Sequence, residues 1–195
     1  MTGFYLENEQ ALNEETMHLL PQFQMIQREA GNDALVYNLH DHMTEVLEKA
    51  GLWEKASCKG ACSFCCHDTI YMPPLEAAYV QKNITEHGIV GNVHRKELQS
   101  SGKDLTFMEK ACPYLEDENE EGRRLCSIYE FRPMVCRTHN STEPIEFCNK
   151  ELYPDRMINE GRIVHTEALI TTLMMMQYDV DANGNPIMTP IHTLK

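Results

Sequence analysis

The stretch CKGACSFCCHD, residues 58–68, carries the densest chemistry of the sequence, and we expect the chain to fold around it. Cysteines three or four residues apart share one face of a helical turn, so Cys58, Cys62 and Cys65 can converge on a metal. Cys66 follows Cys65 directly, and adjacent side chains diverge by about 100° in a helix and about 180° in a strand. The doublet therefore indicates two neighbouring sites, a cluster larger than one ion, or one thiol that is not a ligand.

The first eight residues of this stretch, C-x-x-x-C-x-aromatic-C, match the spelling of a radical S-adenosylmethionine iron–sulfur site. Such an enzyme needs a barrel of βα units after the motif, and each unit takes about 30 residues. The 129 residues after Cys66 leave room for about four units. Short Val/Ile-rich strands alternating with helices are not visible there, so a radical enzyme is the least favoured function.

Four more cysteines lie too far apart for local chelation and must be joined by folding: Cys112, Cys126, Cys136 and Cys148. Clustered thiols in a reducing compartment bind metal more often than they form disulfides, so all eight cysteines are candidate metal ligands. Eight thiols suffice for two four-thiolate sites, or for one such site with spare or reactive thiols. The sequence alone leaves both arrangements open.

Two arginines flank Cys136 in the segment CSIYEFRPMVCR. A four-thiolate site around Zn²⁺, or around an oxidised four-iron four-sulfur core, carries a charge of about −2. Arg132 and Arg137 are therefore candidate cofactor-binding residues whose guanidinium groups neutralise that charge. The alternative is that both arginines pair with the acidic run at residues 116–121.

Two histidines and one proline bear on the choice of metal. His67 and His139 lie close to thiols in sequence, and each could complete a zinc site of three thiolates and one imidazole. Pro113 follows Cys112, as a proline follows the last ligand in bacterial ferredoxin runs. The number of cysteines and their softness favour an iron–sulfur cluster, whereas the frequency of closed structural sites favours zinc.

The composition limits the partners that the chain can bind. Lys plus Arg is 17 against 30 for Asp plus Glu, which gives a net charge of −13. This charge repels nucleic acid and anionic membrane surfaces and would attract a basic protein partner. The amino terminus lacks a basic region followed by an apolar run, and no later stretch reaches the ~18 apolar residues of a membrane span. We therefore expect a soluble, cytoplasmic protein.

The pattern of apolar residues predicts a mainly α fold in a single small domain with a loop-rich cysteine region organised by metal. We expect a helical hairpin over residues 1–55, the cysteine-cluster metal-binding core over 56–150, and a C-terminal helix and tail over 151–195. Within these parts, helices are expected over 33–50, 74–87, 92–99 and 155–177, with the acidic run as a solvated loop. The turn-rich segment DANGNPIMTP, residues 181–190, is expected to be held only at the surface.

Three segments resemble the YkgJ-type cysteine-cluster family, which is described as a zinc- or iron-chelating domain: CKGACSFCC, PPLEAAYV, and ACPYLEDENEEGRRLCSIYEFRPMVCR. The resemblance covers about residues 56–148. The family pattern C-x-x-C-x-x-C-C differs here in its first spacing, which is three residues rather than two, so the role of Cys58 is the least secure. The resemblance implies a metal-binding protein that holds an iron–sulfur cluster, our preferred cofactor, or zinc.

A related cysteine-cluster architecture occurs in flagellin lysine N-methylases, which carry an iron–sulfur cluster. The resemblance therefore also implies an alternative function, a protein-modifying enzyme that uses S-adenosylmethionine. The sequence assigns no catalytic residue for such a reaction, and a binding site for the methyl donor cannot be matched in it. Whether the protein is an enzyme is thus left open at this point.

Overall fold

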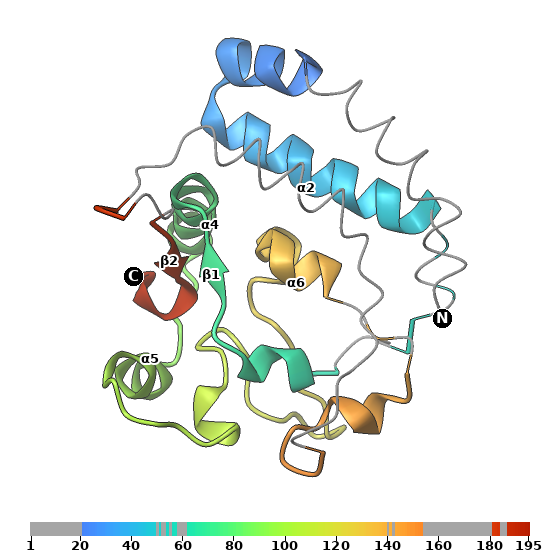
Figure 1. Ribbon diagram of the computed structural model, residues 1–195, viewed down its shortest axis with the longest axis vertical. Helices are drawn as coiled ribbons and strands as arrows, with labels where there is room; N and C mark the ends of the chain where they lie inside the picture. The colour runs from blue at the N-terminus through green and yellow to red at the C-terminus, as the bar shows by residue number, and fades with distance from the viewer. Residues whose placement is uncertain are drawn as a thin grey trace.

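The computed structural model of the chain describes residues 21–49, 51, 54, 56–57, 62–139, 141, 143–153, 181–183 and 187–195. In these residues the fold is mainly helical with one short two-stranded sheet, which confirms the expected fold class (Figure 1). No helix in this part of the chain is long and apolar enough to cross a lipid bilayer. Cys58 and the helix expected over 155–177 lie outside the described residues.

Helix α2 (Asn32–Lys49) is the N-terminal support of the fold. Four apolar side chains recur every four residues along it and are all buried: Leu35, Leu39, Met43 and Leu47. The chain reverses at Gly31, whose φ of 86° suits a residue without a side chain, so that Phe23 of the helical residues 21–30 packs edge-on against His42. The described part of the expected hairpin is therefore a pair of packed helices.

Helices α4 (Pro74–Glu86) and α5 (Val93–Ser100) begin and end within a residue or two of the predicted positions. Pro74 occupies the first helical position of α4, where its missing N–H costs nothing, and Gly88 follows the helix with a φ of 63°. The Asn92 side chain caps α5 by accepting a hydrogen bond from the backbone N–H of Arg95 at 3.1 Å. Helix α2 packs against α4 and against the short helix α6 (Met134–Thr138), as Figure 1 shows.

The C-terminal segment enters the core, and this corrects the expectation that residues 181–190 are held only at the surface. Strand β2 (Thr189–Pro190) pairs antiparallel with β1 (Tyr71–Met72). Beyond β2, the side chains of Ile191 and Leu194 are buried. The expectation failed because two-residue strands carry no recognisable period and their pairing joins segments distant in sequence.

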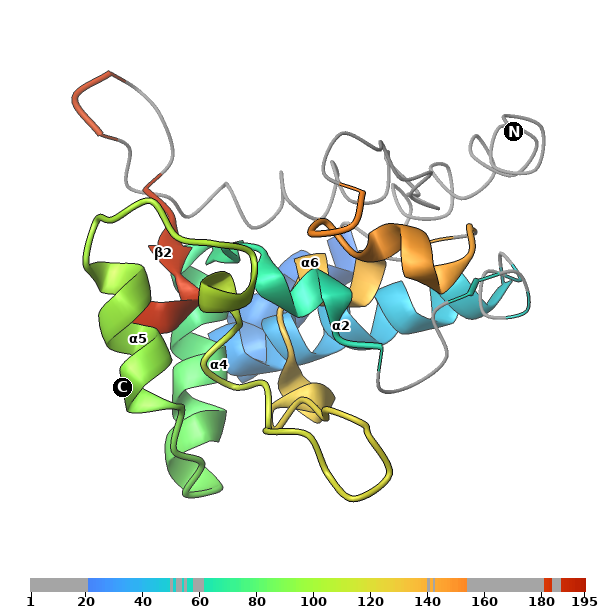
Figure 2. The same ribbon diagram turned by 90° about the horizontal axis from the view of Figure 1, so that it is seen from below.

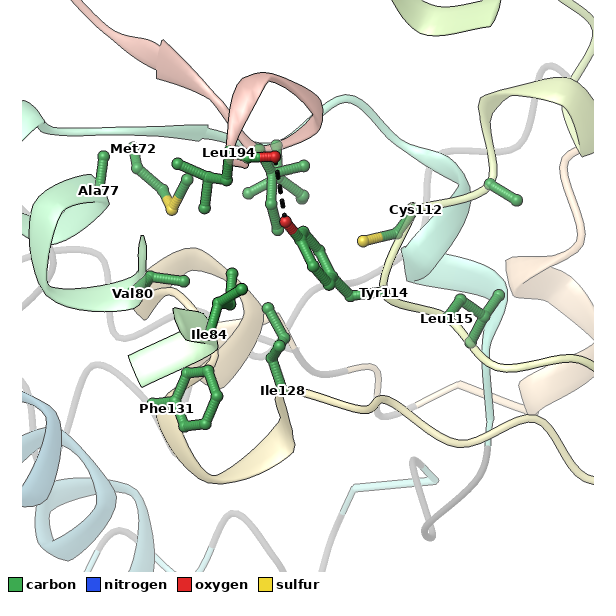
Figure 3. Packing of buried hydrophobic residues seen from close by; sticks show 13 residues of the cluster. Met72, Ala77, Val80, Ile84, Cys112, Tyr114, Leu115, Ile128, Phe131 and Leu194 are labelled. Atoms are coloured by element: carbon green, nitrogen blue, oxygen red, sulfur yellow. Dashed lines mark hydrogen bonds between the residues drawn. The ribbon is translucent and has the colours of Figure 1, made fainter. Parts of the chain in front are cut away.

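The main hydrophobic cluster lies between α4, the β1–β2 pair and the segments that carry the later cysteines (Figure 3). Val80 and Ile84 of α4 face Ile128 and Leu194 across this cluster. Tyr114 is fully enclosed, and its hydroxyl donates a hydrogen bond to the Leu194 carbonyl at 3.3 Å. Because Cys112 belongs to the same cluster and Cys66, Cys126 and Cys136 pack against it, the core also forms one wall of the cysteine region.

Residues 103–153 form short turns rather than long helices, as the weak periodicity predicts. Four short elements follow one another in this described region: η2 (Met108–Lys110), η3 (Tyr129–Phe131), α6 and η4 (Ile145–Cys148). A further short 3₁₀ element, η1 (Phe64–His67), precedes β1. In the view from below, the chain between η2 and α6 forms a long extended loop that projects from the body of the molecule (Figure 2). The acidic run lies in this exposed loop, which confirms that it is solvated.

Candidate metal site

The Cys65–Cys66 doublet lies in η1, a single turn of 3₁₀ helix closed by a hydrogen bond from the Cys66 N–H to the Ser63 carbonyl at 3.0 Å. The Cys66 thiol donates a hydrogen bond to the Cys65 sulfur, and this contact lowers the pKa of Cys65. The same contact, together with burial, raises the pKa of Cys66. The two adjacent thiols are therefore close enough to affect each other's ionisation.

Cys112 is anchored directly to the doublet. Its backbone N–H donates to the Cys66 carbonyl at 2.6 Å, which fixes the start of the CPYL segment beside η1. Burial raises the pKa of the Cys112 thiol to about 12, and the backbone N–H groups of Tyr114 and Leu115 oppose this by donating to the sulfur. Pro113 has no N–H, so the two residues after it supply these donors.

Cys126 is brought beside Cys112 by a narrow antiparallel connection. Leu115 and Cys126 form a β-bridge, and the Ser127 N–H donates to the Tyr114 carbonyl at 2.9 Å. Burial raises the pKa of the Cys126 thiol, whereas the backbone N–H of Ile128 lowers it by donating to the sulfur. The acidic loop between the two cysteines thus closes a hairpin whose base holds two thiols.

Cys136 lies in the middle of α6 and reaches the same region from the other side. Burial raises its pKa well above the ordinary value, and the neighbouring Cys112, Cys65 and Cys126 thiols raise it further. Mutual electrostatic effects of this kind require the groups to be close together in a poorly solvated place. The structure therefore brings together five predicted ligands: Cys65, Cys66, Cys112, Cys126 and Cys136.

The other three candidate cysteine ligands are not placed in this group by the contacts above. Cys62 lies just before η1, and Cys148 ends η4; both are partly buried. Cys58 lies outside the described residues. Across the described ranges, no three Cys, His, Asp or Glu side chains already stand in the geometry of a metal-ligand set. The converged thiols are thus grouped but not pre-shaped for one ion.

Two arginines act on the thiols: the charge of Arg95 lowers the pKa of Cys112, and Arg132 acts on two other cysteines. The Arg132 guanidinium lies 3.7 Å from the centre of the Tyr129 ring and donates to the Tyr129 carbonyl at 2.7 Å. From there its charge lowers the pKa of both Cys65 and Cys126. Arg137 donates through Nε to the Arg132 carbonyl at 3.1 Å and through Nη2 to the Glu130 carbonyl, so it braces the turn that carries Arg132.

Acidic side chains of the exposed loop form ion pairs with arginines. Asp117, Glu121 and Glu118 pair with Arg95, Arg123 and Arg124 respectively. Three acidic residues of the loop are therefore paired with arginines other than Arg132 and Arg137. Arg132 lies just before α6, and Arg137 lies within it. The arrangement favours the interpretation of Arg132 as a charge partner of the thiol region.

Of the two candidate histidine ligands, His67 has one ring nitrogen, Nε2, that is buried without a hydrogen-bond partner in the described part of the chain. His67 is buried in η1, stacks on the Phe107 ring at a centroid distance of 4.6 Å and contacts the Ser63 carbonyl through Nδ1 at 3.1 Å. Burial lowers its pKa, so the ring is neutral near pH 7. The backbone N–H of His139 donates to the Val135 carbonyl at the end of α6.

Sequence reasoning missed one buried polar pair beside the site. Glu76 of α4 hydrogen-bonds His40 of α2 at 2.7 Å, and both side chains are buried. The sequence suggested only that Glu76 is a favourable acidic residue in the first turn of a helix. His40 gave no signal, because it sits among apolar positions of an ordinary amphipathic helix.

A mainly helical fold that gathers soft thiol donors from separate segments into one poorly solvated region is typical of a thiolate metal-binding protein. Residues 57–157 match the model of the family described as "CxxCxxCC: Putative zinc- or iron-chelating domain". The match spans just over half of the chain, and the chain belongs to that family. No curated protein and no solved structure matches the chain in the corresponding comparisons. Metal binding is therefore the general activity of this protein.

Proposed function

We propose that this protein holds an iron–sulfur cluster, in preference to zinc, through thiolates contributed by residues 58–66 and 112–148. The observation that carries the proposal is that cysteines from three separate segments meet at one hydrophobic cluster: Cys112 belongs to it, Cys66, Cys126 and Cys136 pack against it, and Cys65 adjoins Cys66. Cys58, Cys62 and Cys148 complete the proposed set of donors. When bound, the cluster supplies either a redox centre or a cross-link between these segments.

Metal binding would change the protonation state of the buried thiols. Burial raises the pKa values of Cys112, Cys126 and Cys136, so these groups are protonated near pH 7 without metal. A bound cation reverses this preference, because only the thiolate is a strong ligand. Metal binding should therefore release protons and contribute directly to folding stability.

Two features favour an iron–sulfur cluster over zinc. Backbone N–H groups point at the sulfurs of Cys112 and Cys126, and hydrogen bonds to cysteine sulfur are one way in which proteins set the potential of such clusters. In addition, the adjacent cysteines of the Cys65–Cys66 doublet could bind two different iron atoms of a cluster, whereas one tetrahedral ion rarely takes two adjacent cysteines. Either cofactor takes four thiolates, so the number of thiols alone does not decide between them.

The deciding experiment is anaerobic purification followed by analysis for iron, zinc and acid-labile sulfide, with a visible absorption spectrum. We expect iron and sulfide together with a broad visible absorption that chelator or air removes. A colourless protein with stoichiometric zinc would overturn the choice of cluster and retain metal binding. A wild-type protein without any bound metal would overturn the proposed function altogether.

Removing one central ligand tests the shared site. We expect Cys136→Ala to lose the bound metal and to unfold at a lower temperature, because Cys136 faces thiols of both other segments. Cys62→Ala should also lose metal if residue 62 is a ligand. The matched control is Val135→Ala, which shortens the neighbouring, partly buried side chain of α6 and should keep the metal. Full metal content in both cysteine variants would contradict the shared-site proposal.

A second candidate function, an S-adenosylmethionine-dependent protein-modifying enzyme, is supported by Cys65. This residue is partly exposed, and the Cys66 thiol and Arg132 both lower its pKa, which are properties of a reactive thiol or of a ligand beside an open metal position. Titration of the metal-loaded protein with S-adenosylmethionine separates the two functions. Binding with a spectral change would favour the enzyme, whereas an unchanged spectrum and no binding would favour a closed metal-binding module.

A further inference from the structure

The Glu76 carboxylate occupies a buried junction between three helices. It belongs to the first turn of α4 and is 2% exposed. Its Oε1 accepts a hydrogen bond from the backbone N–H of Met134, the first residue of α6, at 2.6 Å. The same oxygen contacts Nε2 of His40 in α2 at 2.7 Å. Because Oε1 already accepts a hydrogen bond from Met134, we assign the donor role in this contact to Nε2 of His40.

The His40 ring is held from two sides in the interior. Its Nε2 is fixed by Glu76, and the ring packs in a T-shaped arrangement with the Tyr79 ring at a centroid distance of 5.6 Å. Within the described part of the chain, Nδ1 of His40 is buried and has no hydrogen-bond partner. The contact with Glu76 is therefore the polar interaction that orients the imidazole and retains it in the core.

Helix α6 depends on this junction more than a longer helix would. It spans only Met134–Thr138, and so short a helix has little stability of its own. The first N–H of α6 has no partner inside the helix, and Glu76 satisfies it. Cys136 lies two residues further along this one-turn helix, and its backbone N–H bonds the Pro133 carbonyl, next to Met134, at 2.9 Å. The direction in which the Cys136 thiol points is therefore tied to the position of Glu76.

We propose that His40 and Glu76 are positioning residues of the metal site, in which His40 orients the Glu76 carboxylate and the carboxylate fixes the start of α6 and hence Cys136. The inference rests on the proposed metal-binding function. It adds a residue outside the matched range 57–157, because His40 lies in α2. Helix α2 thus contributes to the position of a metal ligand through His40.

Three variants test the link while allowing for folding defects. His40→Leu removes the donor to Glu76, His40→Gln keeps an N–H donor at a similar reach, and Glu76→Gln keeps an acceptor for Met134 but removes the charge. The control is Leu47→Ala, which shortens a buried side chain of α2 away from the junction. Circular dichroism and thermal unfolding establish that each variant is folded and how much stability it has lost.

The first measurement is the transfer of metal from each loaded protein to excess chelator. We expect His40→Leu and Glu76→Gln to bind metal about 10–100-fold more weakly, as is typical when a supporting partner of a ligand is removed. His40→Gln should recover most of the affinity. Equal weakening by His40→Leu and Leu47→Ala at equal loss of thermal stability would overturn the proposal.

The second measurement uses the metal-free protein and does not depend on the cofactor. Mass spectrometry gives the alkylation rate of each thiol, and we expect His40→Leu to accelerate alkylation of Cys136 while Cys126 is unchanged. Equal rates at Cys136 in wild type and His40→Leu would overturn the link between the junction and α6. If the wild type holds no metal, the proposed function fails on that ground, and the alkylation rates still decide whether the junction positions Cys136.

Discussion

At the scale of single residues, burial favours the protonated form of the cysteine thiols. The Cys112 thiol is enclosed by the core that also holds Tyr114, and burial raises its pKa to about 12. An isolated buried thiol is stable only in its protonated form, whereas a metal requires the thiolate. The metal-free protein should therefore lose stability as the pH rises, and the metal-loaded protein should lose stability as the pH falls.

This opposition gives a measurable pH dependence. The folded pKa of Cys112 is raised from 9.0 to about 12, so its contribution to stability is complete below pH 9 and is lost as the pH rises through 12. In the metal-free protein, the free energy of unfolding should fall across this window, and less steeply in Cys112→Ala. Urea unfolding at a series of pH values measures it. Identical slopes for the two proteins would contradict the prediction.

The metal-loaded protein should lose stability in the other direction. Protons compete with the cation for the thiolates, so acidification below neutral pH should release metal and lower the unfolding temperature. Thermal unfolding of loaded and chelator-treated protein between neutral and acidic pH checks this. A loaded protein that is as stable in acid as at neutral pH would indicate that the cysteines do not carry the metal.

The residues that could be predicted from sequence are those whose chemistry is local. Cys112, Cys126 and Cys136 were identified as ligands to be joined by folding, and the structure brings them together with Cys65 and Cys66. Which thiols would interact with one another could not be predicted. These interactions depend on contacts such as the one between the Cys112 N–H and the Cys66 carbonyl, which join distant segments.

At the scale of elements, the helices followed from local signals and the strands did not. The limits of α4 came from Pro74 at its start and Gly88 after its end. Strand β2 has no such signal, and its pairing with β1 places Met72 opposite Thr189 from the far end of the chain. Pairing of this kind depends on long-range packing, and short strands are the elements that local sequence specifies least.

The C-terminal segment should therefore contribute strongly to stability. Ile191 is fully buried, and Ile191→Ala should lower the free energy of unfolding by about 2–5 kcal/mol through lost contacts and the cavity left behind. The matched control is Ile187→Ala, at an exposed isoleucine just before β2, which should change it by about 0.5 kcal/mol or less. Urea unfolding measures both variants, and equal effects would mean that β2 does not anchor the core.

At the scale of the whole molecule, the hydrophobic cluster and the thiol region are in direct contact. Cys112 belongs to the cluster, and Cys66, Cys126 and Cys136 pack against it, so metal and core should stabilise each other. The expectation of a basic protein partner, drawn from the net charge of −13, stays a prediction at this scale. The exposed acidic loop is the part of the surface where such a partner would be sought first.

Removal of the metal should loosen one part of the molecule more than the rest. We expect hydrogen exchange to increase most in residues 112–138, which form short turns and one five-residue helix around the cysteines, and least in the 18-residue helix α2. Mass spectrometry of loaded and chelator-treated protein measures this, with Cys136→Ala as a control that chelator should leave unchanged. Uniform exchange along the chain after metal removal would indicate that the metal does not organise the cysteine region.

The order of segments along the chain has a consequence for synthesis on the ribosome. All eight cysteines precede residue 149, whereas Ile191 and Leu194, which complete the wall beside Cys112, come later. A nascent chain therefore presents its thiols before it can enclose them. Metal or cluster delivery has its easiest access in that interval, and so does oxidation of the thiols.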